Sequence, residues 1–316
     1  MKMRVIEEGL HTSIQDLGRI GYRSSGFPIS GPMDSFSMKL ANYLVGNKEN
    51  TAVVEMSFVG PTIEWTKDAI ISITGADMVP RLNGKQISLY RPIIIRSGDI
   101  LQFRTARNGL YTYLAIKGGL AISKKLGSRS MLVRTEGTGL LSRKLQVGDQ
   151  IPINSITTPN IKLNWSMNPN TFEIYSSTEV IHYIEGPQAD WFKQNQLDIT
   201  EWSISTRSNR MGYRLMGDEI ETTRTQQLLT EPTSFGSIQV PPDGQPIILM
   251  ADSQPTGGYP KIGQVILADL PKLSQLLPTK RFMFERCTIS NAYKALATQK
   301  QLLTKLSHTL KQKWEG

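Results

Sequence analysis

A polar, glycine-rich loop follows an apolar run in the second half of the chain. The run ends at Asp252, and the loop then carries two adjacent glycines before Tyr259 and Lys261. Glycine adopts backbone angles that other residues avoid, and it lets a ligand approach the main chain closely. A buried strand that delivers polar groups to such a loop is a common way to present chemistry to a ligand. The segment therefore predicts a small-molecule site, although it does not by itself define a reaction.

Three further clusters place polar groups beside small residues. In the first, Asp16 and Arg19 either form a buried pair that shapes a loop or hold a substrate. The second, around Arg129, is either an anion cradle, because guanidinium binds carboxylate or phosphate through two bonds, or a tight turn with a solvated arginine. The third, 205–214, has three arginines in eight residues and is either another anion site or a solvated turn.

The composition excludes several classes of protein. With 316 residues, 39% hydrophobic and 20% charged, the chain is long enough for about two ordered domains. A single cysteine excludes an internal disulfide framework, and the three histidines are too far apart to predict a metal site. No apolar run reaches the roughly 18 residues that a membrane span needs, and the first residues contain no apolar signal core. We therefore expect a cytoplasmic protein without a metal and without a membrane contact.

The net charge of +9 raises the question of a nucleic-acid partner. Much of the excess lies after Asn291, and the other basic residues are scattered along the chain. Because no run of Arg and Lys is interleaved with aromatic residues, we predict no nucleic-acid binding.

Short strands must position these clusters. Runs rich in β-branched and aromatic residues, each bounded by turn formers, recur at 69–74, 93–96, 111–116 and 180–184. This spacing predicts a mainly β fold with few helices, as a sandwich or barrel. Asp34 is expected to cap a helix that extends to residue 45.

The domain boundary is predicted in the polar, Pro-containing region 152–172. The predicted parts are an N-terminal β-barrel-like domain, 1–155, a C-terminal β-barrel domain, 172–290, and a basic amphipathic helix, 291–316. The helix is expected either to pack on its own domain or to contact a partner.

Taken in order, the motifs resemble the allophanate hydrolase subunit 2 family, which includes carboxyltransferases. The resemblance covers about residues 4–290 and is carried by 15–21, 30–34, 126–130, 208–212, 236–241 and 257–261. It implies two cyclophilin-like β-barrel domains. Family members commonly have Gln-Thr-Thr before Gly-Gly-Tyr, whereas here Pro255 replaces the first threonine and removes a backbone donor. We expect this change to alter fine specificity.

The resemblance also implies activity within a complex. For a chain of this length it favours the C subunit of an ATP-dependent 5-oxoprolinase, a hydrolase that converts 5-oxo-L-proline to L-glutamate. Because the chain carries no recognised nucleotide motif, we expect it to be inactive alone. The implied partners are a subunit 1 or KipI-like protein, which is the B subunit of 5-oxoprolinase, and the A subunit of that enzyme. One alternative is a carboxyltransferase that uses carboxybiotin and urea or a related amide. The other is a KipA-like binding protein that antagonises a KipI-type kinase inhibitor.

A lactam is a poor electrophile, and phosphorylation of its oxygen gives an imidate that water can attack. Such a reaction needs groups that hold an anionic substrate and stabilise phosphoryl charge. We therefore expect Asp252, Gln239 and Tyr259 to be catalytic by orienting the amide. The substrate- or anion-binding candidates are Gln15, Asp16, Arg19, Arg129, Arg210, Gly257, Gly258 and Lys261. ATP is expected to act in the complex, and biotin only under the carboxyltransferase alternative.

Overall fold

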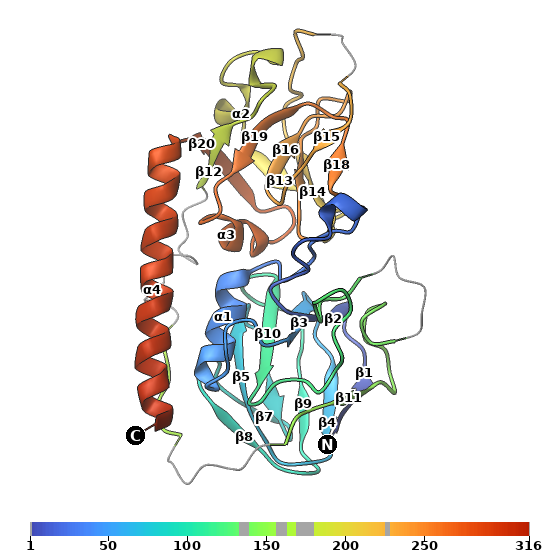
Figure 1. Cartoon of the computed structure of the whole chain (residues 1–316), viewed down its shortest axis with the longest axis vertical. Helices are drawn as coiled ribbons and strands as arrows, with labels where there is room; N and C mark the ends of the chain where they lie inside the picture. The colour runs from blue at the N-terminus through green and yellow to red at the C-terminus, as the bar shows by residue number, and fades with distance from the viewer. Residues whose placement is uncertain (1, 133–138, 156–162, 169–179, 225–227, 316) are drawn as a thin grey trace. The chain divides into compact units, whose positions relative to one another are not determined.

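The computed structural model describes residues 2–132, 139–155, 163–168, 180–224 and 228–315 (Figure 1). The chain divides into two compact units. Unit 1 comprises Met1–Arg19, Ser30–Phe172 and Leu302–Gly316, and unit 2 comprises Ile20–Ile29 and Glu173–Gln301. About half of the predicted boundary region, 152–172, lies outside the described residues, and the sequence-based domain limits remain predictions. The mainly β fold is confirmed.

Unit 1 contains two antiparallel sheets. One has the order β11 (Gln150–Pro152), β1 (Lys2–Glu7), β4 (Thr62–Trp65), β9 (Ile100–Gln102), β6 (Arg81–Leu82) and β7 (Lys85–Gln86). The other has the order β2 (His11–Gln15), β3 (Val53–Ser57), β10 (Tyr111–Ile116), β5 (Ala69–Gly75) and β8 (Ile93–Ile95). Residues of both sheets, including Ile14, Trp65 and Leu101, share one buried hydrophobic core. Burial of this apolar surface is the main stabilising contribution to the unit.

Helix α1 (Ser35–Leu44) packs against β5 and β10. As predicted, Asp34 caps it: the backbone at Asp34 is extended, and its Oδ1 accepts a hydrogen bond from the Ser37 amide at 2.9 Å. Two hydroxyls of β5 bond to main-chain oxygens of the helix, Thr74 to Ser37 and Ser72 to Ala41. The helix is thus held by polar bonds as well as by its apolar face.

Unit 2 is a closed seven-stranded barrel. Its strand order is β12 (Val180–Glu185), β19 (Lys261–Val265), β16 (Ser237–Gln239), β17 (Ile247–Leu249), β14 (Gly212–Met216), β13 (Trp202–Ile204) and β20 (Arg281–Arg286). Strands β12 and β20 pair in parallel and close the barrel. Apolar side chains of alternate residues are fully or almost fully buried, among them Tyr213, Ile238 and Ile248. A small ribbon pairs β15 (Glu231–Pro232) with β18 (Thr256–Gly257).

Short helical segments complete unit 2. They are the 3₁₀ turns η1 (Arg23–Ser25) and η4 (Ala189–Trp191) and the helices α2 (Gln196–Ile199) and α3 (Leu270–Ser274).

The long C-terminal helix, α4 (Ile289–Glu315), begins two residues before the predicted 291. Within unit 1, its Leu303 and Leu310 are buried, and the Trp314 indole donates to the main-chain oxygen of Leu44 at 3.1 Å. The ammonium of Lys117 lies 3.5 Å from the centre of the Trp314 ring, and burial lowers the pKa of Lys117. These contacts fit the expectation that the helix packs on its own chain. Among the described residues, no helix is long and apolar enough to cross a membrane.

Candidate functional site

One row of paired residues crosses four neighbouring strands of the barrel in unit 2. Arg214 pairs with Ile247, Ile247 pairs with Gln239, and Gln239 pairs with Lys261. Directly paired residues of antiparallel strands project to the same face of a sheet. Because the alternate residues, such as Ile238 and Ile248, fill the barrel interior, this row lies on its outer face. Groups from three separate sequence motifs therefore share one surface.

The side chain of Gln239 lies beneath the β18 end of the glycine-rich loop. It is only 2% exposed, and its Nε2 donates to the main-chain oxygen of Tyr259 at 3.2 Å. A Cβ added to Gly257 would lie 2.7 Å from that same Nε2, closer than real Cβ atoms approach. Glycine at 257 therefore allows the loop to pack on the amide of Gln239.

Lys261 is held next to Gln239 by an acidic group and by main chain. Its Nζ lies 2.6 Å from Glu231 Oε2 and donates to the Pro232 oxygen at 3.1 Å. The hydrogen bond from Lys261 lowers the pKa of the Glu231 carboxyl. Gln188 completes the cluster, since its Nε2 donates to Glu231 at 3.2 Å and its Oε1 accepts the Lys261 amide at 3.0 Å.

The sequence did not predict Glu231 or Gln188 as site residues. Glu231 lies next to a proline in a short polar segment, and Gln188 follows Gly186-Pro187, so neither belongs to a local motif that indicates a site. Glu231 reaches Lys261 because β15 pairs with β18, and Gln188 reaches it from the turn after β12, which pairs with β19, the strand of Lys261.

Arg23 anchors the loop that carries Pro255. It belongs to the N-terminal 20–29 segment, which is part of unit 2. Its Nη2 donates to the main-chain oxygens of Thr233 and of Pro255, the latter at 2.9 Å. Thr233 bonds to the same loop, with its amide donating to the Pro255 oxygen at 2.9 Å and its hydroxyl to the Gln254 oxygen at 2.7 Å. The position that departs from the family pattern is therefore tightly held.

Arg210 and Asp252, predicted for different roles, form one bidentate pair. Arg210 Nε lies 2.6 Å from Asp252 Oδ2, and Nη2 lies 3.1 Å from Oδ1. Their side chains are only 6% and 14% exposed. The Asp252 amide also donates to the Arg210 main-chain oxygen at 2.9 Å. Both carboxylate oxygens are engaged, so the pair fastens the start of the loop to the 209–211 turn.

Tyr259, the third residue predicted to be catalytic, is exposed, whereas Gln239 is buried. Its side chain is 46% exposed, and its main-chain oxygen makes the contact with Gln239. The other arginines of the 205–214 cluster, Arg207 and Arg214, are exposed and line a pocket on the outer face of the barrel. The three arginines therefore occupy two environments, one buried and one open.

In unit 1, Asp16 is the centre of a buried hydrogen-bond network. Its Oδ1 accepts from the Ser128 hydroxyl at 2.5 Å, the Ser130 hydroxyl at 2.8 Å and the Gly18 amide at 3.0 Å. Its Oδ2 accepts from the Arg129 amide at 2.6 Å. Such a saturated carboxylate fits the loop-shaping alternative better than the substrate-binding one.

The other substrate-binding candidates of unit 1 also form hydrogen bonds to main-chain and side-chain groups of this unit. Arg19 is fully buried and donates to the Ser130 oxygen at 2.7 Å, and Arg129 Nε donates to the Ile122 oxygen. Gln15 is buried and donates to the Ser13 hydroxyl at 3.0 Å, while its Oε1 has no hydrogen-bond partner within the described residues. The structure thus groups Gln15, Asp16, Arg19 and Arg129 in unit 1, separate from the unit 2 row.

A second buried network in unit 1 involves Glu55 and Tyr113. Glu55 Oε2 accepts from the Tyr113 hydroxyl and from the Met33 amide, both at 2.8 Å, and the Asp34 amide donates to the Tyr113 hydroxyl at 2.7 Å. Burial, followed by the Glu55 charge, raises the pKa of Tyr113 far above its usual value. The network fixes the turn that precedes α1. The part of the chain that the structure describes contains no group of three or more acidic, histidine or cysteine residues suited to a metal ion.

Comparisons with known proteins extend over almost the whole chain. The family model described as "Carboxyltransferase domain, subdomain A and B" matches residues 25–286. A curated Haemophilus influenzae protein, named as the C subunit of 5-oxoprolinase, is 35% identical over 292 residues, which covers 92% of this chain and 93% of that protein. An Escherichia coli protein with the same name is 32% identical over 317 residues, which covers 98% of this chain and 98% of that protein.

Among solved structures, the urea carboxylase of Kluyveromyces lactis is similar to this chain with a TM-score of 0.88 and 29% sequence identity. The match covers 96% of this chain but 29% of that larger protein. The fold of this chain therefore also occurs as one part of a longer enzyme.

Proposed function

This chain belongs to the carboxyltransferase domain family, subdomains A and B, and we propose that it is the C subunit of an ATP-dependent 5-oxoprolinase. The observation that carries the proposal is the nearly end-to-end match to two curated proteins of that name, at 35% and 32% identity. The relatives' designation as a C subunit indicates a multi-subunit enzyme. We propose the A subunit and a KipI-like B subunit as the partners, and we expect this chain to be inactive alone.

The row on the unit 2 barrel supports an amide-binding role. Gln239 offers a side-chain amide and Lys261 offers an ammonium on adjacent paired positions. A lactam oxygen that gains negative charge is stabilised by fixed donors and cations, and these are worth most where water is excluded. Both side chains are buried, and both are fixed by hydrogen bonds to β15, β18 or the loop after β18. These hydrogen bonds hold both side chains in fixed positions on this face of the barrel.

In the proposed reaction, 5-oxoproline, ATP and two waters give glutamate, ADP and phosphate. ATP supplies the phosphoryl group that converts the lactam oxygen into a leaving group, and the C–N bond breaks after water adds to the ring carbon. The contribution we assign to this chain is to hold the amide. Gln239 and Lys261 orient it, while the Arg210–Asp252 pair and Arg23 position the loop that covers them.

A carboxyltransferase acting on urea is the second candidate. The similarity to Kluyveromyces lactis urea carboxylase, with a TM-score of 0.88, favours it. That reaction also needs an amide-binding site, but it requires carboxybiotin and hence a biotin carboxylase and a carrier. The binding role of a KipA-like protein remains a prediction from the sequence.

Reconstitution of the complex tests the proposal. This chain would be combined with the A and B subunits of the enzyme, and ATP hydrolysis would be measured with 5-oxoproline or urea. Hydrolysis that depends on 5-oxoproline and on all three chains supports the proposal. Carboxylation of urea in the presence of a carboxybiotin donor, without turnover of 5-oxoproline, supports the second candidate and rejects the first.

A further inference from the structure

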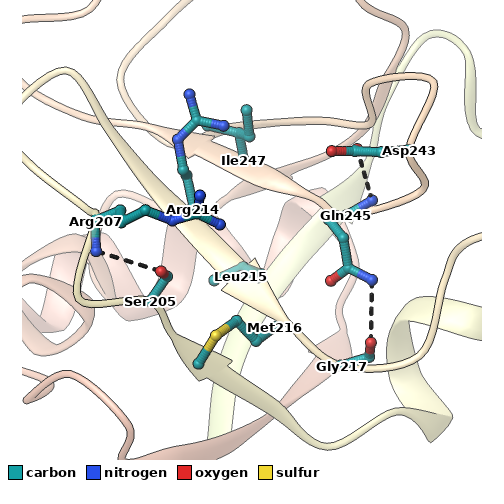
Figure 2. A pocket seen from close by; sticks show the side chains of 9 residues that line it. All are labelled: Ser205, Arg207, Arg214, Leu215, Met216, Gly217, Asp243, Gln245 and Ile247. Atoms are coloured by element: carbon teal, nitrogen blue, oxygen red, sulfur yellow. Dashed lines mark hydrogen bonds between the residues drawn. The ribbon is translucent and has the colours of Figure 1, made fainter.

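The open end of the row on the unit 2 barrel is a pocket of about 320 Å³ (Figure 2). Its size lies at the lower end of the range for small-molecule sites, roughly 300–1,000 Å³. Arg214 and Ile247, which belong to the row, form part of its wall. The pocket therefore continues the surface that carries Gln239, which is one strand, or about 5 Å, from Ile247.

The charges around this pocket suit a singly charged anion. Arg207 and Arg214 lie at one side of it, and Asp243 lies at the other (Figure 2). Neither arginine forms an ion pair with any residue that the structure describes, and Asp243 Oδ1 accepts the Gln245 amide at 3.1 Å. Two positive groups and one negative group leave one net positive charge, which one carboxylate would balance.

The remaining wall suits a small body that carries an amide. Ile247 and Met216, the latter 43% exposed, supply apolar surface. Gln245 Nε2 donates to the Gly217 oxygen at 3.2 Å, and this bond fixes the orientation of the side-chain amide. Its Oε1 points toward the middle of the pocket (Figure 2). An oxygen held in this way is an acceptor for a ligand N–H group.

We propose that this pocket binds a small monocarboxylic acid with an amide N–H, and that it takes up 5-oxoproline as an initial binding site apart from Gln239 and Lys261, which are not among its lining residues. The carboxylate is held by Arg207 and Arg214, the lactam N–H donates to Gln245 Oε1, and the ring lies against Met216 and Ile247. The identity of the ligand rests on the proposed function. The pocket itself rests on its lining residues.

Ligand binding by the full-length chain tests the pocket apart from catalysis. Ligand-observed NMR would compare 5-oxoproline with 2-pyrrolidone, the same lactam without its carboxylate. We expect 2-pyrrolidone to bind at least about tenfold more weakly, because it loses a charge-assisted contact. Arg214→Gln and Arg207→Gln should each weaken 5-oxoproline binding by about tenfold and leave 2-pyrrolidone unchanged. Arg286→Gln, which removes an exposed unit 2 arginine paired with Glu185, should have no effect.

Three results would overturn the pocket assignment: no binding of 5-oxoproline by the wild-type chain, equal binding of the two lactams, or binding unchanged in both arginine variants. Because both arginines are exposed, the variants are expected to fold, and thermal unfolding of each checks this. Failure of the proposed function would be recognised separately. If 5-oxoproline binding depends on the arginines but the reconstituted complex does not turn it over, the pocket assignment stands and the oxoprolinase role is rejected. If the complex turns over 5-oxoproline but binding does not depend on the arginines, the oxoprolinase role stands and the pocket assignment is rejected.

Discussion

Arg214 and Gln239 flank the same residue, Ile247, from the two neighbouring strands of the unit 2 barrel. Their side chains therefore lie on one face, about 10 Å apart across two strand spacings. One of them lines an open pocket, and the other is buried beneath the β18 end of the glycine-rich loop. This relationship places the proposed anion-binding pocket and the proposed amide-binding residues on one face of the barrel.

The close approach of Gly257 to Gln239 predicts a specific sensitivity. Gly257→Ala should destabilise the chain by about 1–3 kcal/mol, because the new Cβ would overlap the Gln239 amide. Gly258→Ala is the matched control for stability, since its Cβ would meet nothing nearer than 3.7 Å. Chemical denaturation measures both. Equal stability of the two variants would show that the loop does not pack on Gln239 as described.

The buried Arg210–Asp252 pair predicts a large effect when one partner is neutralised. Asp252→Asn should lower the free energy of unfolding by about 3 kcal/mol, because it removes the carboxylate charge that faces the buried Arg210 guanidinium. Arg281→Gln removes one partner of an exposed pair with Glu201 and should change stability little. Urea denaturation compares the two. A small effect of Asp252→Asn would mean that the carboxylate is free for another role.

The contact between Arg23 and the Pro255 loop predicts a change in local dynamics. Arg23→Gln should speed hydrogen exchange at the Thr233 amide by about tenfold, because that amide donates to the oxygen that Arg23 also binds. Arg4→Gln, which removes an exposed partner of Glu64 in unit 1, serves as the control. Unchanged protection at Thr233 in the Arg23 variant would contradict the anchoring role.

The Lys261–Glu231 contact predicts a dependence of stability on pH. The Lys261 hydrogen bond lowers the pKa of Glu231 in the folded chain. The stabilisation that this contact gives the folded chain is therefore fully present above the ordinary glutamate pKa of about 4.3. This stabilisation is lost as the pH falls below about 4.3 and then through the lower pKa that Glu231 has in the folded chain. The wild type should therefore have a higher unfolding temperature than Glu231→Gln at pH 6, and the gap should close toward pH 3. A gap that stays constant over this range would rule the linkage out.

Local features of the sequence were sufficient for part of the fold. The helix capped by Asp34 follows from a cap and an apolar face within ten residues, and the strands follow from β-branched runs between turn formers. The site depends on strand register. The direction that each side chain faces from the turn and strand decides the environments of Arg207, Arg210 and Arg214. Their spacing in the sequence does not determine those directions.

Long-range contacts account for most of what sequence reasoning did not foresee. Arg23 and Pro255 are 232 positions apart, and Gln188 reaches Lys261 from 73 positions away. The Arg210–Asp252 pair joins two motifs that each suggested an independent function. No periodicity or local composition encodes such pairs, because they form only when the barrel closes.

The central claim is that the unit 2 row holds the amide substrate of an oxoprolinase, and Lys261→Met tests it most directly. In the reconstituted complex, 5-oxoproline-dependent ATP hydrolysis by this variant should fall at least about a hundredfold, because a fixed cation beside the lactam oxygen is lost. Arg286→Gln should keep wild-type turnover, and size-exclusion chromatography should show that both complexes assemble. Wild-type turnover in an assembled Lys261→Met complex would contradict the account.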